Sequence, residues 1–250
     1  MTKTTQGNVF LASHAHSDPS LDPQRPTILP ETTSINPDKA TSLRLLMVTP
    51  RYFPYIGGVE THVYEVARRL VRIGVDVTIL TADPGGRLPV DEQAEGIHIR
   101  RVRAWPAQRD YYFAPAIARI IRQGDWNVVH VQSYHTLVAP LALLAAWQAK
   151  LPYVVTFHGG GHSSALRHRL RGVQQILLRP LLAQANRLVA LARFEIDEYS
   201  QRLQLPPARF VLIPNGSDLA SVERPVDSTR EAGLLASVGR LERYKGHHRM

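Results

Sequence analysis

The stretch from Leu43 to Leu70 constrains the fold of this chain most strongly. It reads LRLLMVTPRYFPYIGGVETHVYEVARRL: a short apolar strand, a loop with two adjacent glycines, and an amphipathic helix. In an open α/β sheet, such a first strand-to-helix corner is where a phosphate can meet the unpaired amides of a helix N-terminus. The spacing matches neither the GxGxxG fingerprint nor the GxxxxGK[ST] loop, so a plain structural turn fits this stretch equally well.

The same alternation of strands and helices continues along the chain. Expected strands cover 43–49, 75–80, 97–102, 127–131, 153–157, 187–191 and 209–213; expected helices cover 59–73, 111–121, 135–149, 163–185 with a break near Pro180, and 194–203. Residues 81–96 are expected to form turns. Short apolar strands separated by helices indicate a parallel sheet covered on both faces, and right-handed crossovers make it doubly wound. The sequence therefore predicts an α/β, Rossmann-like fold.

Composition divides the chain into four parts. Residues 1–42 are rich in Thr, Ser, Pro, Asp and His without apolar periodicity, and we expect a disordered tail. Residues 43–214 hold the Rossmann-like domain, and 215–232 form a polar linker. A fresh strand begins after residue 232, so we expect 233–250 to be the start of a truncated second domain that cannot bury a core of its own.

Charge and composition narrow the choice of partners and location. The chain has 30 Lys+Arg against 21 Asp+Glu, a net charge of +9. This excess fits phosphate-bearing substrates, an anionic membrane or nucleic acid, but also a solvated basic surface. No strand alternates aromatic and basic residues, so we expect no nucleic-acid partner. The lack of cysteine, of a signal peptide and of an apolar stretch near 20 residues leads us to expect a cytoplasmic protein.

Three sets of residues are candidates for binding. Gly57 and Gly58 allow a ligand to approach the backbone closely. His158 follows the strand expected at 153–157, at the carboxyl end where ligands bind in open sheets, although it could instead cap a flexible turn. Arg240 and Lys245 follow the last expected strand, and their charges suit a diphosphate, although loop cations are mostly solvated.

The segment Ser163 to Arg187 is basic and amphipathic. It contains arginines but no acidic residue, with leucine, valine and isoleucine interleaved. Such a segment can lie on an anionic membrane as a peripheral contact, and we expect this contact at the inner face of the membrane. It can also line an acceptor cleft. The alternative is an ordinary helix with one side facing the core and a basic side facing water.

Five blocks in this order resemble family 4 of the retaining glycosyltransferases. They are GGVETHV from Gly57, DWNVVH from Asp125, PYVVTFHG from Pro152, IPNG from Ile213, and VGRL with Lys245-Gly246 from Val238. The resemblance implies a B-type glycosyltransferase fold, in which two Rossmann-like domains face each other across a cleft. The acceptor, a glycan, a lipid or a small molecule, would lie mainly on the first domain. The nucleotide-sugar donor would lie mainly on the second.

The resemblance also implies residue roles. Gly57 and Gly58 would contact the donor diphosphate or the transferred hexose, His158 would contact that sugar as the catalytic histidine, and Arg240 and Lys245 would neutralise the diphosphate as it leaves. The acceptor would attack from the face where the diphosphate departs, so no protein nucleophile is needed. No Asp-x-Asp motif occurs, and neither a metal nor another cofactor is expected.

This sequence departs from the family pattern at two positions and at its end. Gln132 stands where the family often has a second histidine, and Ala192 stands where a serine is common. A pair of glutamates in the family's nucleotide-sugar site would lie beyond residue 250. We therefore expect the chain alone to be inactive.

Two other readings remain open. A non-catalytic module could bind a glycan, a lipid or a protein partner through the same domain. A dinucleotide-dependent oxidoreductase is disfavoured because the fingerprint is absent and because the expected second strand ends before Asp83.

Overall fold

The computed structural model describes residues 42–106, 112–134, 136–159, 165–216 and 249. Nearly all of the predicted disordered tail, of the predicted linker and of the predicted start of a second domain lies outside the described residues. Arg240 and Lys245 lie outside them as well. The statements below concern the described part of the chain.

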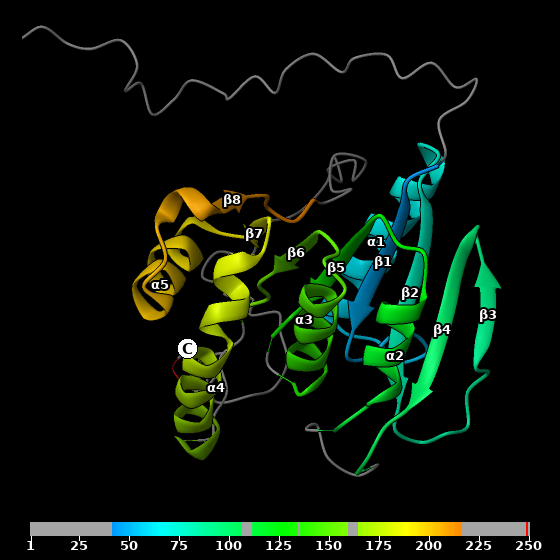
Figure 1. Ribbon diagram of the computed structural model, residues 1–250, viewed down its shortest axis with the longest axis horizontal. Coiled ribbons are helices and arrows are strands. Elements are labelled where there is room, and N and C mark those ends of the chain that lie inside the picture. The colour runs from blue at the N-terminus through cyan, green and yellow to red at the C-terminus, as the bar shows by residue number, and fades with distance from the viewer. Residues whose placement is uncertain (1–41, 107–111, 135, 160–164, 217–248, 250) are drawn as a thin grey trace, which may run out of the picture. The chain divides into compact units, whose positions relative to one another are not determined.

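The described residues form an eight-stranded sheet with the order β3-β4-β2-β1-β5-β6-β7-β8 (Figure 1). The strands are β1 Arg44–Thr49, β2 Asp76–Asp83, β3 Asp91–Ala94, β4 Ile97–Arg103, β5 Val128–Gln132, β6 Tyr153–Thr156, β7 Arg187–Ala190 and β8 Phe210–Leu212. Every neighbouring pair is parallel except β3 and β4. This arrangement confirms the predicted α/β fold with a mostly parallel sheet.

Helices cover both faces of this sheet. They are α1 Gly58–Arg72, α2 Ala116–Gln123, α3 Val138–Gln148, α4 Ala165–Gln184 and α5 Arg193–Leu203. Alternate residues of β1 face opposite cores, as the period of two along a strand requires. Met47 packs in the core that includes Val63 and Ala67 of α1. Leu46 and Val48 instead belong to the core shared by α2, α3, α4 and α5.

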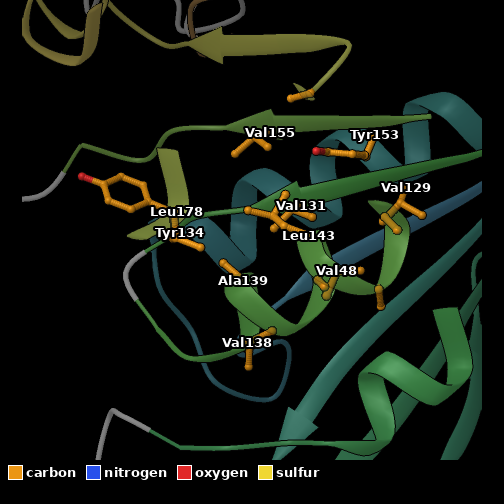
Figure 2. Packing of buried hydrophobic residues seen from close by; sticks show 14 of the residues in the cluster. Val48, Val129, Val131, Tyr134, Val138, Ala139, Leu143, Tyr153, Val155 and Leu178 are labelled. Carbon is orange, nitrogen blue, oxygen red and sulfur yellow. The ribbon is translucent and has the colours of Figure 1, made fainter. Parts of the chain in front are cut away.

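The larger core lies between the sheet and the second group of helices. Figure 2 shows Leu143 of α3 beside Val131 of β5, with Val155 of β6 in the same cluster. These three side chains are fully buried. β-Branched side chains of the short strands pack against the apolar helix α3, and this packing holds the strands at fixed positions. The carboxyl ends of β1, β5 and β6 are therefore well placed to carry a site.

Three predicted elements differ from the structure. Residues 81–96 are not all turns, because β2 continues to Asp83 beside β4 and because β3 pairs with β4. β3 was not recognisable since its residues are exposed and polar. The β3–β4 hairpin turns at Glu95 and Gly96, both at positive φ, which suits a tight two-residue hairpin.

The other two differences concern helices. The predicted helix 111–121 begins only at Ala116, since the preceding chain forms a bridge between Trp105 and Phe113. The predicted break near Pro180 is wrong, because α4 is one continuous helix that contains Pro180. Leu178 and Leu182 are buried on either side of this proline. Their burial holds the helix together although the proline lacks a backbone donor.

Candidate active site

The corner between β1 and α1 is built around a buried carboxylate. Glu60, in the first turn of α1, is only 8% exposed. A Cβ atom added to Gly57 would lie 2.4 Å from Glu60 Oε2, whereas a Cβ on Gly58 would meet nothing within 4 Å. Gly57 therefore makes room for the glutamate. Gly58 leaves open space at the start of the helix, where unpaired amides and the helix dipole favour a negative charge.

His158 lies just after β6 and belongs to a polar network that spans two strands. Its Nε2 atom is 2.8 Å from Oε1 of Gln132, the last residue of β5. Gln132 Nε2 is 3.3 Å from Nδ1 and 3.2 Å from Nε2 of His130. His130 Nε2 is in turn 2.7 Å from Thr156 Oγ1. The histidine at the carboxyl end of β6 is thus held by side chains of β5 and β6.

Burial determines the charge of His130. It lowers the pKa of this histidine to about 4, and the nearby His62 acts in the same direction. His130 is therefore neutral near pH 7. A neutral imidazole offers one hydrogen-bond donor and one acceptor, which is what a directed network requires.

His62 connects α1 to the rest of the site. Its ring lies edge-on to that of His158, with 5.0 Å between the ring centroids. Burial lowers the pKa of His62, while a hydrogen bond with Asn215 opposes this shift. A pocket of about 590 Å³ lies at this junction, lined by Gly57, Gly58, Thr61, His62, Glu65, Val66, Arg69 and residues 213–216. The structure thus brings the two predicted glycines to one pocket, with His158 adjoining it through His62.

A second buried carboxylate fixes the chain that follows His158. Glu195, on the first turn of α5, is 3% exposed. Its Oε1 accepts the N–H of Gly159 at 2.8 Å, and its Oε2 accepts the N–H of Leu191 at 2.7 Å. A Cβ on Gly159 would lie 2.3 Å from Glu195 Oε1. The glutamate therefore ties the loop after β6 to the loop after β7.

Sequence reasoning missed Glu60, His62 and Glu195 as parts of this region. Both glutamates lie three residues after the residue that caps their helix, which is the position of the acidic member of a capping box. This spacing was the sequence signal that could have identified the two glutamates. His62 lies one helical turn after Gly58, so the 3.6-residue period places it on the side of the glycine corner.

The prediction that β2 ends before Asp83 is wrong. Asp83 is the last residue of β2, but its Oδ2 accepts the N–H of Leu88 at 2.9 Å and its side chain is buried. The carboxylate thus serves its own loop. A dinucleotide-dependent oxidoreductase is therefore disfavoured by the absent fingerprint and by this use of the Asp83 carboxylate within its own loop.

Two kinds of feature are absent from the described residues. They contain no group of three or more His, Cys, Asp or Glu side chains arranged to hold a metal ion. No helix among them is both long enough and apolar enough to cross a membrane.

Residues 56–221, which include both glycines and His158, match the family described as Glycosyltransferase Family 4. The chain belongs to glycosyltransferase family 4. This confirms the resemblance seen in the sequence blocks. The match begins after β1 and extends through β8. All of the site residues named above lie within it.

Curated relatives agree with this family. The chain is 30% identical over 184 residues to a GDP-mannose:cellobiosyl-diphosphopolyprenol alpha-mannosyltransferase of Xanthomonas oryzae pv. oryzae, covering 71% of this chain and 47% of that protein. It is 31% identical over 187 residues to a phosphatidyl-myo-inositol mannosyltransferase of Mycolicibacterium smegmatis, covering 72% of this chain and 45% of the relative. The family-4 chain thus spans about half the length of these relatives.

A solved structure shows the same fold. The sucrose-phosphate synthase of Thermosynechococcus elongatus superimposes with a TM-score of 0.55 at 16% identity. The alignment covers 71% of this chain and 49% of that one. At this identity the likeness concerns the fold alone. It supports the B-type glycosyltransferase fold for the described domain.

Proposed function

We propose that this chain supplies the acceptor-side half of a retaining hexosyltransferase. The enzyme would transfer a sugar from a nucleotide-sugar donor to a glycan, lipid or small-molecule acceptor. The observation that carries the proposal is the pocket where Gly57, Gly58 and His62 meet, with His158 in contact with His62, in a family-4 chain. Relatives named for a diphosphopolyprenol-linked sugar and for phosphatidyl-myo-inositol favour an acceptor on a lipid carrier.

The proposed chemistry needs no protein nucleophile. The bond between the anomeric carbon and the diphosphate breaks, the acceptor oxygen bonds to that carbon from the same face, and the acceptor proton moves to a diphosphate oxygen. The open start of α1 at Gly58 would stabilise negative charge on the diphosphate, since helix N-termini attract anions. His158 would hold the transferred sugar, and Arg240 and Lys245 would neutralise the departing diphosphate. We propose that no metal takes part.

Retention of configuration is tested on the product. If the acceptor attacks from the departing face, the product keeps the anomeric configuration of the donor. The anomeric coupling constant in the NMR spectrum of the product reports this directly. An inverted product would overturn the retaining mechanism.

We propose that the chain alone lacks turnover, because it spans about half the length of the transferases it resembles. The test joins the full chain, including Arg240 and Lys245, to the remaining carboxyl-terminal part of the Xanthomonas oryzae relative. GDP-mannose affinity is then measured by calorimetry for the joined protein and for the chain alone. Affinity that appears only in the joined protein supports a transferase. Tight glycan or lipid binding by the chain alone, unaffected by donor, would instead support a non-catalytic binding module.

We also propose that α4 contacts an anionic membrane from the cytoplasmic side. Ile176 and Leu177 are 70% and 71% exposed, and Arg179 and Arg187 are exposed on the same segment. Apolar side chains that face water beside arginines are suited to the boundary between acyl chains and anionic headgroups. A surface of this kind would bring a soluble domain to a lipid-borne acceptor.

A further inference from the structure

A groove separate from the candidate active site lies between the loop after β1, helix α1 and the β3–β4 hairpin. Its volume is about 500 Å³, and the residues that line it include Tyr52, Phe53, Tyr64, Glu92, Glu95 and Arg101. Among the described residues, none lines both this groove and the pocket at Gly57 and Gly58. The proposed sugar transfer therefore gives this groove no role.

Arg101 fixes the walls of the groove relative to one another. This residue of β4 is only 5% exposed. Its Nη1 donates to Glu92 Oε2 at 2.7 Å and to the carbonyl of Pro89 at 3.2 Å, and its Nη2 donates to the carbonyl of Phe53 at 3.0 Å. A planar guanidinium presents several donors in a fixed geometry and suits such a junction. The groove is therefore formed before any ligand binds.

Tyr52 supplies a hydroxyl that has no partner in the described part of the protein. Tyr52 is 3% exposed, yet its hydroxyl forms no hydrogen bond with any described residue. Its oxygen is not sealed from water, unlike the buried and unpaired Thr81 Oγ1. Burial raises the pKa of Tyr52 to about 12, so near pH 7 the hydroxyl can both donate and accept. A largely buried polar group in this situation calls for a partner from outside the chain.

Glu95 adds a carboxylate to the groove. Tyr64 Oη donates to Glu95 Oε1 at 2.7 Å, which leaves Oε2 able to accept from a ligand. Glu95 has a φ of 51° in the β3–β4 turn, where asparagine or glycine would fit the backbone better. The turn therefore does not explain the glutamate, whereas its carboxylate contributes directly to the groove.

Aromatic rings give the groove an apolar surface. The ring centroids of Tyr52 and Phe53 are 5.0 Å apart, and those of Phe53 and Tyr64 are 5.4 Å apart. Rings in mutual contact are held in place, so a ligand that packs against them costs little conformational entropy. An apolar surface with a few fixed polar groups is typical of a small-molecule site.

The charges of the groove favour an uncharged ligand. The charged side chains among its described lining residues are Glu92, Glu95 and Arg101, and Arg101 is already paired with Glu92. A phosphate would be repelled by the remaining charge of Glu95, and an organic cation would be repelled by Arg101. A ligand with several hydroxyls can instead donate to Glu95 and exchange hydrogen bonds with Tyr52.

We propose that this groove binds a neutral sugar unit of a glycan, with Tyr52 and Glu95 bonded to its hydroxyls and the aromatic rings against its C–H face. A β-linked gluco ring fits best, because its equatorial hydroxyls leave C–H groups on both faces. The binding itself does not depend on transferase activity. That the bound unit belongs to the acceptor glycan rests on the proposed function.

The experiment titrates cellobiose, which contains two gluco rings joined by a β link, into the full ¹⁵N-labelled chain. The NMR signals of the Phe53, Tyr64 and Glu95 amides should shift with a dissociation constant of about 1–10 mM. Added salt should not weaken this binding, because the ligand carries no charge. Tetramethylammonium and inorganic phosphate are titrated in parallel. Unshifted amides with cellobiose, or tighter binding of either charged probe, would overturn the proposal.

Two matched substitutions locate the sugar. Tyr52→Phe removes a hydroxyl that no described residue uses, so we expect unchanged thermal stability and a cellobiose affinity about 3–10-fold lower. Tyr55→Phe is the control, because Tyr55 is exposed in the same loop and does not line the groove. It should bind cellobiose as the wild type does. Equal affinity in Tyr52→Phe and in the wild type would show that the sugar binds elsewhere and would overturn the proposal.

Failure of this inference is separable from failure of the proposed function. A joined protein that transfers sugar although the chain binds no cellobiose would refute the groove and leave the transferase standing. Cellobiose in the groove of a joined protein without transfer would do the reverse. Millimolar binding by the chain alone also differs from the tight glycan binding that would indicate a non-catalytic module.

Discussion

Gly57 and Gly58 are adjacent in the sequence, yet the structure gives them different surroundings. We predict that Gly57→Ala lowers the free energy of unfolding by about 1–3 kcal/mol, because the new Cβ displaces the buried Glu60 carboxylate from its place. Gly58→Ala should change it by less than about 1 kcal/mol and in the stabilising direction, since alanine favours the first turn of a helix. Urea denaturation measures both values. Equal losses in the two variants would contradict this account of the corner.

Glu195 is predicted to hold the loop that follows His158. Glu195→Gln places an amide N–H₂ against one of two backbone N–H donors, so we expect a loss of about 1–3 kcal/mol in stability. Hydrogen exchange at the amides of Gly159 and Leu191 should accelerate. The control is Glu198→Gln, which removes only a surface ion pair with Arg202 and should cost less than about 1 kcal/mol. Unchanged exchange at Gly159 would refute the predicted role of Glu195.

The half-buried His130 predicts how the free energy of unfolding depends on pH. Its pKa is about 4 in the folded protein and about 6.5 in an unfolded chain, so the unfolded state binds more protons between these values. Stability is therefore fully present above pH 6.5 and falls as the pH drops towards 4. We expect His130→Gln to reduce this fall by up to about 3 kcal/mol. Thermal or urea unfolding at several pH values measures how steeply the free energy of unfolding falls with pH. The control is His98→Gln, at an exposed position. An equally steep fall in His130→Gln and in this control would contradict the prediction.

Among the elements, α4 carries the proposed membrane contact. We predict that Leu177→Glu weakens binding to phosphatidylglycerol vesicles by about tenfold, because an exposed apolar contact is lost and a negative charge is added. Added salt should weaken binding of the wild type as well. Co-sedimentation measures both effects. The control is Ile73→Glu, at a similarly exposed position at the end of α1, and this variant should bind vesicles as the wild type does. An equal loss of vesicle binding in both variants would argue against α4 as the contact.

Elements with apolar periodicity could be predicted from the sequence, whereas those set by tertiary contacts could not. β1, β5 and β6 were recognisable because their buried residues are β-branched or aliphatic. β3 consists of Asp, Glu, Gln and Ala, and only its pairing with β4 makes it a strand. α4 continues through Pro180 because buried leucines on both sides hold it, which a rule based on proline alone does not foresee.

For the molecule as a whole, the residues at strand ends were predictable and their partners were not. Gly57 and Gly58 lie in the loop after β1, and His158 follows the strand predicted at 153–157, so the strand pattern pointed to all three. His62, Gln132 and Glu195 join them through contacts between segments distant in sequence, namely α1 with β6, β5 with β6, and α5 with the loop after β6. Such contacts depend on the order of strands in the sheet. The sequence pattern alone leaves that order open.

The central claim is that this chain contributes the sugar-contacting histidine of a glycosyltransferase. The most direct test is the rate of sugar transfer by the protein in which the full chain is joined to the remaining carboxyl-terminal part of the Xanthomonas oryzae relative. We predict that His158→Ala lowers kcat by about 10²–10³-fold, the loss typical for removal of one group that stabilises a transition state. The exposed control His98→Ala should retain the wild-type rate. Equal kcat in the wild type and in His158→Ala would contradict the claim.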